Sequence, residues 1–372
     1  MANLGVRDTG HLVMLTGWDA AVLQNYKLED GTNFAEIVGL LNAGLGALNS
    51  ELSAGLWGSL ISFQDFPEVE YRVGSSNGME EHTEYGRPDA QRAATEGHML
   101  PLKAWDRMLG WTWDYLRKAR ASQIEADIQD SLKDVRDRWR LRVLDRLLQR
   151  GDDSGANNGL GSSGYSPGFA TTAASTSVDF TPPSNGGTSF ASTHEHYVGI
   201  AGGAFTNAVF TDAKDELREH GHEPPYEFVI GPSDETTVRG LTDFYPVANS
   251  NVAYGANVSL ATLGSDADMI GGYYIGTQTD FNIRVVRGIP QYYGFGWKSY
   301  GQLSQMNPIR IRLPKGEGRP NAFAMTNPLA GTGQYPIQDL MMFLEFGVGV
   351  GDRTNGTARY VNNATWSDGT VT

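Results

Sequence analysis

The chain has 372 residues, 40% hydrophobic and 10% aromatic, a composition typical of a globular protein and not of a disordered one. Its formal net charge of −14 argues against a dedicated nucleic-acid binder, because neutralising phosphates requires a surplus of lysine and arginine. The sequence has no cysteine, which excludes disulfides, thiolate catalysis and cysteine-ligated zinc, and no apolar run reaches the ~20 residues of a membrane helix.

Residues 1–33 show little periodicity and are predicted to form an extended arm that ends in the turn Asp30-Gly31-Thr32. In residues 33–52 apolar side chains recur at spacings of three and four, which predicts an amphipathic helix. Residues 68–73 alternate polar and apolar side chains, as a half-exposed strand does, and Asn77-Gly78 is a strong hairpin-turn signal.

Residues 79–96 are polar, charged and poor in large aliphatic side chains, so this stretch cannot bury itself. We therefore expect it to project from the body of the protein or to lie on another subunit. The chain that returns from it, residues 97–112, carries apolar side chains that can pack.

The clearest predicted element is a helix over residues 122–150, about 43 Å long at ~1.5 Å per residue. Ser122 and Glu125 match a capping box, arginines gather near the end, and Gly151 is expected to terminate the helix. One face carries an apolar stripe at spacings of three and four: Ile124, Ile128, Leu132, Val135, Trp139, Val143 and Leu147.

A low-complexity Gly/Ser-rich linker follows at 152–192, a length that usually serves an interaction or stays mobile. A helix is predicted at 204–220, with Phe205, Val209, Ala213 and Leu217 on its buried side. Residues 226–230 are predicted to be a buried strand, and a further helix begins at Pro232. Strands are expected at 269–275, 281–286 and 309–312, and a strand pair, 340–350 with 358–361, is expected to be joined through Asn355-Gly356.

The strongest candidates for a chemical site are seven possible metal ligands in two groups near the ends of the 204–220 helix: His194, Glu195 and His196 in one, and Glu219, His220, His222 and Glu223 in the other. A helix of about 17 residues would separate the two groups by roughly 25 Å, so we expect no metal site. We also expect no catalytic and no cofactor-binding residues. The glycine-rich strings lack the order of a phosphate-binding loop, and no catalytic triad can be assembled.

The order of these elements resembles that of the Hong Kong 97-like major capsid proteins of tailed bacteriophages. Three stretches are similar to the family: the Glu-Gly-x-x-Leu-Pro pattern at 96–101, the strand that leads into a proline-capped helix at 228–233, and the glycine-rich 346–356. The resemblance spans about residues 58–366, and its specificity lies in the order and spacing of the motifs.

The resemblance implies an α+β fold with an N-terminal arm, a protruding β-hairpin called the extension loop, a long spine helix, and peripheral and axial lobes. The corresponding parts are the arm and first helix (1–57), the extension-loop hairpin (58–112), and the peripheral lobe (113–224) with the spine helix 122–150 and the linker 152–192. The axial lobe with a surface excursion (225–333) and the C-terminal strands of the peripheral lobe (334–372) complete the chain.

The implied function is structural and not enzymatic: self-assembly into hexamers and pentamers that form an icosahedral shell around phage DNA, without sequence-specific DNA binding and without a membrane. The implied partners are further copies of the chain, a portal and a decoration protein, and, because no long charged helical segment opens the chain, a separate scaffolding protein. The implied location is the virion capsid, assembled in the host cytoplasm. The alternatives are an encapsulin-like nanocompartment shell and a soluble enzyme with an unrecognised site.

Two groups of residues are predicted to contact neighbouring subunits. The arm offers apolar anchors, Val13, Leu15 and Trp18, although packing of the arm on its own subunit is an equally good interpretation. The hairpin offers charges of both signs, which fix register more than they add affinity: Glu80, Glu81, Glu84, Arg87 and Arg92.

Overall fold

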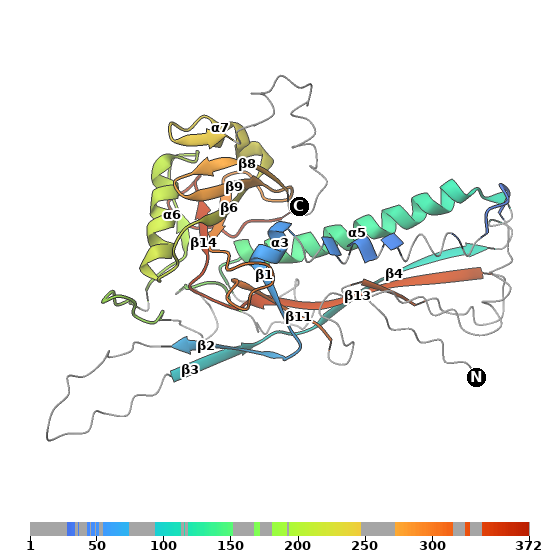
Figure 1. Cartoon of the computed structure of the whole chain (residues 1–372), viewed down its shortest axis with the longest axis horizontal. Helices are drawn as coiled ribbons and strands as arrows, with labels where there is room; N and C mark the ends of the chain where they lie inside the picture. The colour runs from blue at the N-terminus through green and yellow to red at the C-terminus, as the bar shows by residue number, and fades with distance from the viewer. Residues whose placement is uncertain are drawn as a thin grey trace. The chain divides into compact units, whose positions relative to one another are not determined.

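A computed structural model gives the structure of the chain (Figure 1). It describes residues 28–33, 55–73, 94–112, 118–151, 167–171, 181–191, 193–246, 272–314, 324–327 and 337–371, with residue 115 and positions 36, 43, 44, 46–48, 50 and 51. Within this part of the chain, a helix with the length and apolar character needed to cross a bilayer is not found. The chain forms two compact units: unit 1 (1–54, 102–140, 312–347) and unit 2 (55–101, 141–311, 348–372).

Unit 1 combines the larger part of a long helix, α5 (Ala121–Leu148), with an antiparallel sheet that it accompanies in Figure 1. In that sheet β13 (Ile337–Val350) pairs with both β4 (Lys103–Thr112) and β12 (Ala324–Asn327). The ring of Trp139 on α5 lies 4.9 Å from that of Phe346 on β13, so aromatic packing joins the helix to the sheet.

The apolar stripe predicted for the long helix is buried along its whole length. Each of its seven residues is at most 8% exposed: Ile124, Ile128, Leu132, Val135, Trp139, Val143 and Leu147. The helix begins and ends within two residues of the predicted bounds. The prediction is confirmed because steps of three and four place these side chains on one face.

The N-terminus of α5 is capped differently from the prediction. The helix begins at Ala121, so Gln123 and not Glu125 occupies its third position. The side-chain oxygen of Gln123 accepts a hydrogen bond from the Arg120 N–H (3.0 Å), and an Asp30 carboxylate oxygen accepts one from the Ala121 N–H (2.9 Å). The Ala121 bond is the largest cause of a lowered pKa of Asp30, and an anion here also suits the helix dipole.

The C-terminus of α5 is closed by one of its own arginines. The Arg146 guanidinium donates hydrogen bonds to the carbonyl oxygens of Gln149 (2.5 Å) and Gly151 (2.7 Å). Carbonyls at a helix end lack partners within the helix, so the arginine satisfies them and adds a positive charge where the dipole favours one.

Unit 2 is built on a seven-stranded sheet in the order β5-β14-β10-β6-β9-β8-β7. The pairs β14–β5 and β6–β9 are parallel, and the other pairings for which a register is defined are antiparallel. The strands are β5 (Tyr197–Gly199), β6 (Tyr226–Ile230), β7 (Phe244–Pro246), β8 (Tyr273–Gln278), β9 (Phe281–Val285), β10 (Tyr293–Trp297) and β14 (Thr357–Tyr360).

Helix α6 (Asn207–Glu219) packs on this sheet, as Figure 1 shows. The predicted buried side is confirmed, and it forms one core with the strands: Phe205, Val209, Phe210, Ala213 and Leu217 with Phe228, Phe281 and Ile283. After β6 a short 3-10 turn (Pro232–Asp234) leads into α7 (Glu235–Arg239), which confirms the helix expected at Pro232.

Strand β10 was not predicted, although it lies between β14 and β6 inside the sheet. Two of its five residues are glycine, which weakens the strand pattern in the sequence. A Cβ at Gly294 would lie 2.5 Å from the Phe228 ring, and one at Gly296 would lie 2.8 Å from it. The glycines therefore make room for Phe228, a requirement that only the folded sheet creates.

The predicted pairing of the two C-terminal strands is wrong. Both strands exist, but β13 pairs with β4 and β12, whereas β14 pairs with β10 and β5. Asn355-Gly356 is therefore not a hairpin turn. The Asn355 side chain accepts a hydrogen bond from the Lys298 N–H (2.7 Å) and donates one to the Lys298 carbonyl (2.9 Å), and a Cβ at Gly356 would collide with the Phe169 ring.

The predicted hairpin begins as an antiparallel ladder of β2 (Glu68–Val73) and β3 (Ala94–Met99) in unit 2. Its last pair is Val73 with Ala94, so residues 74–93, which lie outside the described residues, connect the strands. A two-residue turn at Asn77-Gly78 would pair residue 76 with 79, a register that differs from that of this ladder.

Two elements precede β2 in the chain: α3 (Gly55–Leu60) and β1 (Ile61–Gln64). Strand β1 is a neighbour of β11 (Ile309–Arg312) in its sheet.

Part of the predicted linker is bound into the core of unit 2. Residues 152–166 and 172–180 lie outside the described residues, but Phe169 between them is fully buried, with its ring 5.0 Å from that of Phe295. Arg353 holds the same segment: its Nε donates to the Gly168 carbonyl (2.9 Å), and its own carbonyl accepts from the Ala170 N–H (2.9 Å). The sequence analysis did not predict that Phe169 is buried, because the Gly/Ser-rich composition around it is typical of a linker.

The five-part division of the chain stays a prediction, since each compact unit gathers segments from several of those parts. The described positions between 36 and 51 are helical, as predicted for 33–52. Of the predicted excursion 314–334, the structure describes Pro314 and β12.

We expect Gly294→Ala to lower the free energy of unfolding of the subunit by about 1–3 kcal/mol, because the new methyl group overpacks the buried Phe228 ring. Gly151→Ala is the matched control: a Cβ there meets nothing within 4 Å, so the change should stay within about 0.5 kcal/mol. Urea unfolding followed by circular dichroism measures both. Equal stability of the two variants would contradict the steric argument.

Candidate functional site

The residues predicted to contact neighbouring subunits all lie outside the described residues: Val13, Leu15, Trp18, Glu80, Glu81, Glu84, Arg87 and Arg92. Their predicted role therefore stays a prediction. The described part of the chain instead contains a cluster of side chains that the sequence prediction kept apart.

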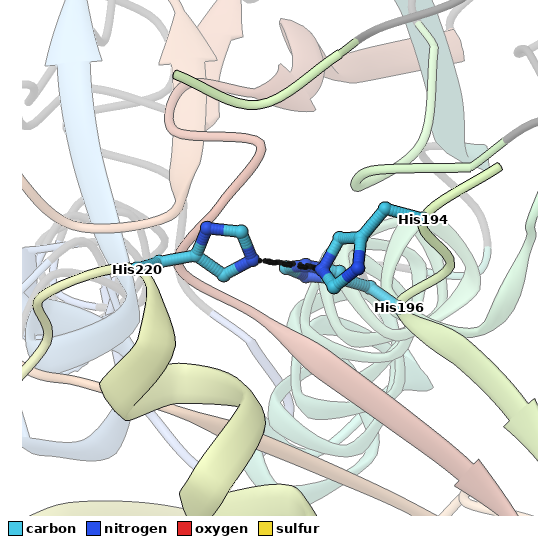
Figure 2. Close-up of side chains that lie close together, drawn as sticks. All are labelled: His194, His196 and His220. Atoms are coloured by element: carbon cyan, nitrogen blue, oxygen red, sulfur yellow. Dashed lines mark hydrogen bonds between the residues drawn. The ribbon is translucent and has the colours of Figure 1, made fainter. Parts of the chain in front are cut away.

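Three histidines of unit 2 turn their Nε2 atoms toward one common point (Figure 2). The Nε2 atoms of His194 and His196 are 3.1 Å apart, and each lies 2.9 Å from the Nε2 of His220. A carboxylate oxygen of Glu219 is 3.3 Å from the His194 Nε2 and 4.0 Å from the His220 Nε2. We call His194, His196 and His220 the histidine cluster.

The expectation that these histidines stay about 25 Å apart is wrong. His194 and His196 do not lie at the start of the helix; they precede β5, which runs parallel to β14. The chain then continues through β5 and residues 200–206 before α6 begins, and α6 leads back to His220. Strand β5 and residues 200–206 therefore run in the direction opposite to α6 and over a similar length. As a result, the C-terminus of α6 lies next to His196.

The orientation of His196 is fixed by the backbone next to β14. Its Nδ1 lies 2.6 Å from the Gly356 carbonyl oxygen, which can only accept, so Nδ1 carries the proton and Nε2 offers a lone pair to the cluster. A ring held in this way through its other nitrogen is typical of histidines that bind metals.

Burial keeps the cluster neutral. It lowers the pKa of His220 to about 2, with the neighbouring histidines as further causes, and it lowers the pKa of His196 well below the ordinary value. Burial also lowers the pKa of His194 and raises that of Glu219. At neutral pH the three rings are therefore imidazoles and not imidazolium ions.

The residues before the cluster fold over the end of α6. The Phe190 ring stacks on the His220 ring, with centroids 4.3 Å apart, and lies 4.9 Å from the His194 ring. The Asn185 side chain donates a hydrogen bond to the Glu219 carbonyl (3.2 Å). The end of the predicted linker thus supplies an apolar cover for the cluster.

A buried ion pair holds α6 against β14 beside the cluster. The Glu216 carboxylate accepts a hydrogen bond from the Arg359 guanidinium (2.7 Å) and another from the Thr357 hydroxyl. The side chain of Arg359 is 2% exposed and that of Glu216 is 10% exposed. Since Thr357 follows Gly356, this pair fixes both the helix and the carbonyl that orients His196.

The fourth histidine considered from the sequence does not join the cluster. The Nδ1 of His222 lies 2.8 Å from the Tyr300 hydroxyl, and its Nε2 lies 3.1 Å from the Thr354 hydroxyl, so both nitrogens are engaged elsewhere. Among the described residues, the histidine cluster is the one group of three or more His, Asp or Glu residues placed to hold a metal ion. Three imidazoles and a nearby carboxylate form a donor set that suits a divalent cation.

We expect Glu216→Gln to destabilise the subunit by about 3–5 kcal/mol, because it leaves the Arg359 charge buried without its counter-ion. Lys214→Gln on the same helix is the control. Lys214 forms an ion pair at 3.4 Å with Asp280, whose side chain is 53% exposed, so its loss should lower the free energy of unfolding by less than about 1 kcal/mol. Thermal and urea unfolding give both values, and a loss of similar size in both variants would argue against a special role of the buried pair.

No protein-family model matches the sequence, and no curated protein matches it. Among solved structures, the chain is similar to one from Mycobacterium phage Patience, with 21% sequence identity and a TM-score of 0.59 over 91% of each chain. Two capsid structures are less similar. The capsid of a native GTA particle has 14% identity and a TM-score of 0.48, over 84% of this chain and 91% of that one. The bacteriophage PhiM1 mature capsid has 10% identity and a TM-score of 0.47, over 84% and 88%.

At 21% identity the Patience structure and this chain share a fold, and the similarity spans nearly the whole of both chains. The predicted α+β fold class is confirmed: the chain has the fold of the Mycobacterium phage Patience structure.

Proposed function

We propose that this chain is the major capsid protein of a tailed bacteriophage, and that it assembles into hexamers and pentamers of an icosahedral shell around phage DNA. The observation that carries the proposal is the structural similarity to the Mycobacterium phage Patience protein over 91% of both chains. A similarity of that extent includes residues of both compact units, and not of one alone.

The physical character of the chain agrees with a structural role. Helix α5 is 28 residues long, about 42 Å at ~1.5 Å per residue, and can act as a strut within the subunit. The net charge of −14 suits the inner wall of a DNA container, because an acidic surface does not adhere to packaged phosphates.

The contacts between subunits are proposed to come from two segments, the extension-loop hairpin and the N-terminal arm. The β2–β3 ladder is the base from which residues 74–93 reach a neighbour, where Glu80, Glu81, Glu84, Arg87 and Arg92 would pair with opposite charges. Val13, Leu15 and Trp18 of the N-terminal arm would clamp an adjacent subunit. Many such weak contacts, repeated by symmetry, close a shell.

Further parts of the proposal concern the surroundings of the shell. Assembly in the host cytoplasm would involve a separate scaffolding protein and a portal, and a decoration protein would bind the finished lattice. These partners follow from the resemblance of the sequence to the capsid family.

The full-length protein, expressed alone or with its scaffolding protein, is expected to form closed particles in negative-stain electron micrographs. Particles that contain DNA after infection support the capsid role, whereas particles filled with a protein cargo would indicate a nanocompartment. A protein that stays monomeric under both conditions would refute the proposal and favour the enzyme alternative.

Deletion of residues 79–94 is expected to leave a folded subunit that does not make closed shells, because the deleted stretch is polar and has its partners on a neighbour. Circular dichroism checks that the variant folds, and electron microscopy checks assembly. Normal particles from the deletion variant would show that the hairpin is dispensable.

A further inference from the structure

We propose that the histidine cluster, His194, His196 and His220, is a binding site for one divalent first-row transition-metal ion, with Zn²⁺ as its representative occupant. The proposal is independent of the capsid role, since it rests on the interior of unit 2. It replaces the sequence-based expectation of no metal site.

The first argument is an inventory of donors and acceptors. Each Nε2 of the cluster either carries a proton and donates, or offers a lone pair and accepts; it cannot do both. Three such atoms within 2.9–3.1 Å of one another must therefore include at least one pair of the same kind, two donors or two acceptors. At least one of the three close contacts is thus repulsive in every combination of tautomers, and a cation removes the conflict by engaging all three lone pairs.

The second argument is distance. With metal–nitrogen bonds of about 2.1 Å, neighbouring ligands are about 3.0 Å apart in an octahedral site and about 3.4 Å apart in a tetrahedral one. The observed separations of 2.9, 2.9 and 3.1 Å match three ligands on one face of an octahedron. A tetrahedral Zn²⁺ site would require each pair to open by a few tenths of an ångström.

The third argument is that the ligands are held in place before a cation arrives. The Gly356 carbonyl fixes the tautomer and direction of His196 (2.6 Å), and Phe190 stacks on the His220 ring. Imidazole nitrogens prefer Zn²⁺, Ni²⁺, Co²⁺ and Cu²⁺ to Mg²⁺ or Ca²⁺, which select oxygen ligands. The donor set therefore specifies the class of metal.

Glu219 completes the surroundings of the site. One of its carboxylate oxygens lies 3.3 Å from the His194 Nε2, so a negative charge faces the position of the cation. The Glu219 side chain is 36% exposed and that of His194 is 19% exposed, whereas that of His220 is 1% exposed. A cation would therefore enter the site from the partly exposed side, where Glu219 and His194 lie.

A bound cation would join two segments directly, and through the hydrogen bond of His196 to the Gly356 carbonyl it would also be connected to a third. His194 and His196 precede β5, His220 follows α6, and Gly356 precedes β14. An ion that binds the folded chain more tightly than the unfolded chain raises stability in proportion to the logarithm of its concentration. The site would therefore act as a structural clamp of unit 2.

The test uses the full-length protein, stripped with a chelator and then equilibrated with Zn²⁺ alone or with Co²⁺ alone. Equilibrium dialysis with elemental analysis is expected to find about one Zn²⁺ per chain, and Co²⁺ is expected to give the visible absorption of nitrogen ligation. His194→Ala, at the partly exposed edge of the cluster, should lower Zn²⁺ affinity at least tenfold and abolish the rise of Tm with Zn²⁺.

His222→Ala is the matched control, because it removes a buried histidine two residues from His220 whose nitrogens bond to hydroxyl groups elsewhere. It should keep the wild-type affinity. Glu219→Gln should weaken binding by about tenfold without abolishing it, as the loss of a group beside the ligands does; unchanged affinity would exclude Glu219 from the site. The proposal is overturned if wild type and His194→Ala bind Zn²⁺ equally, or if His222→Ala loses as much affinity as His194→Ala.

Discussion

The packing of α6 on the seven-stranded sheet is the constraint on which unit 2 depends. Phe228 stands at its centre: its ring lies 5.0 Å from that of Phe210 on the helix, and it occupies the space that Gly294 and Gly296 leave open on β10. Such a core tolerates little change in volume, because close-packed interiors transmit any overlap to their neighbours. The helix is held at one place on the sheet, and every feature attached to its ends is placed with it.

The histidine cluster follows from that placement. His220, at the end of α6, lies near the point where β5 and β14 begin. The Glu216–Arg359 ion pair holds α6 against β14 close to that point. His196 then meets a backbone carbonyl that fixes its tautomer. The polar interior of unit 2 is thus organised around a few buried groups, each with a defined partner, as low-dielectric surroundings require.

The proposed shell role calls for a rigid body and for segments that contact neighbouring subunits, and these two requirements fall on different parts of the sequence. Helix α5 buries seven apolar residues on one face and has both ends closed, by Asp30 and Gln123 at the start and by Arg146 at the end. The charged stretch 79–96 has no comparable apolar face. A metal clamp would stabilise unit 2 itself, since it would join segments of one subunit and not of two.

The sequence by itself determined the elements whose information is local. The spacing of Ile124 to Leu147 predicted the long helix, the alternation at 68–73 predicted β2, and the apolar side of α6 was identified from Val209, Ala213 and Leu217. Helix periodicity and strand alternation are properties of neighbouring residues, so they can be recognised without the rest of the chain. The order of these elements was enough to indicate the fold.

Tertiary structure alone decided which strands pair and which side chains meet. The two glycines of β10 weaken its strand pattern, and the need for them comes from Phe228 on another strand. Strands β13 and β14 are close in sequence but pair with distant strands, β13 with β4 and β14 with β10. His196 and His220 meet because β5 and the following turn run back along α6, a path that no spacing in the sequence records. Contacts between distant residues depend on where the chain reverses, and that is a property of the whole fold.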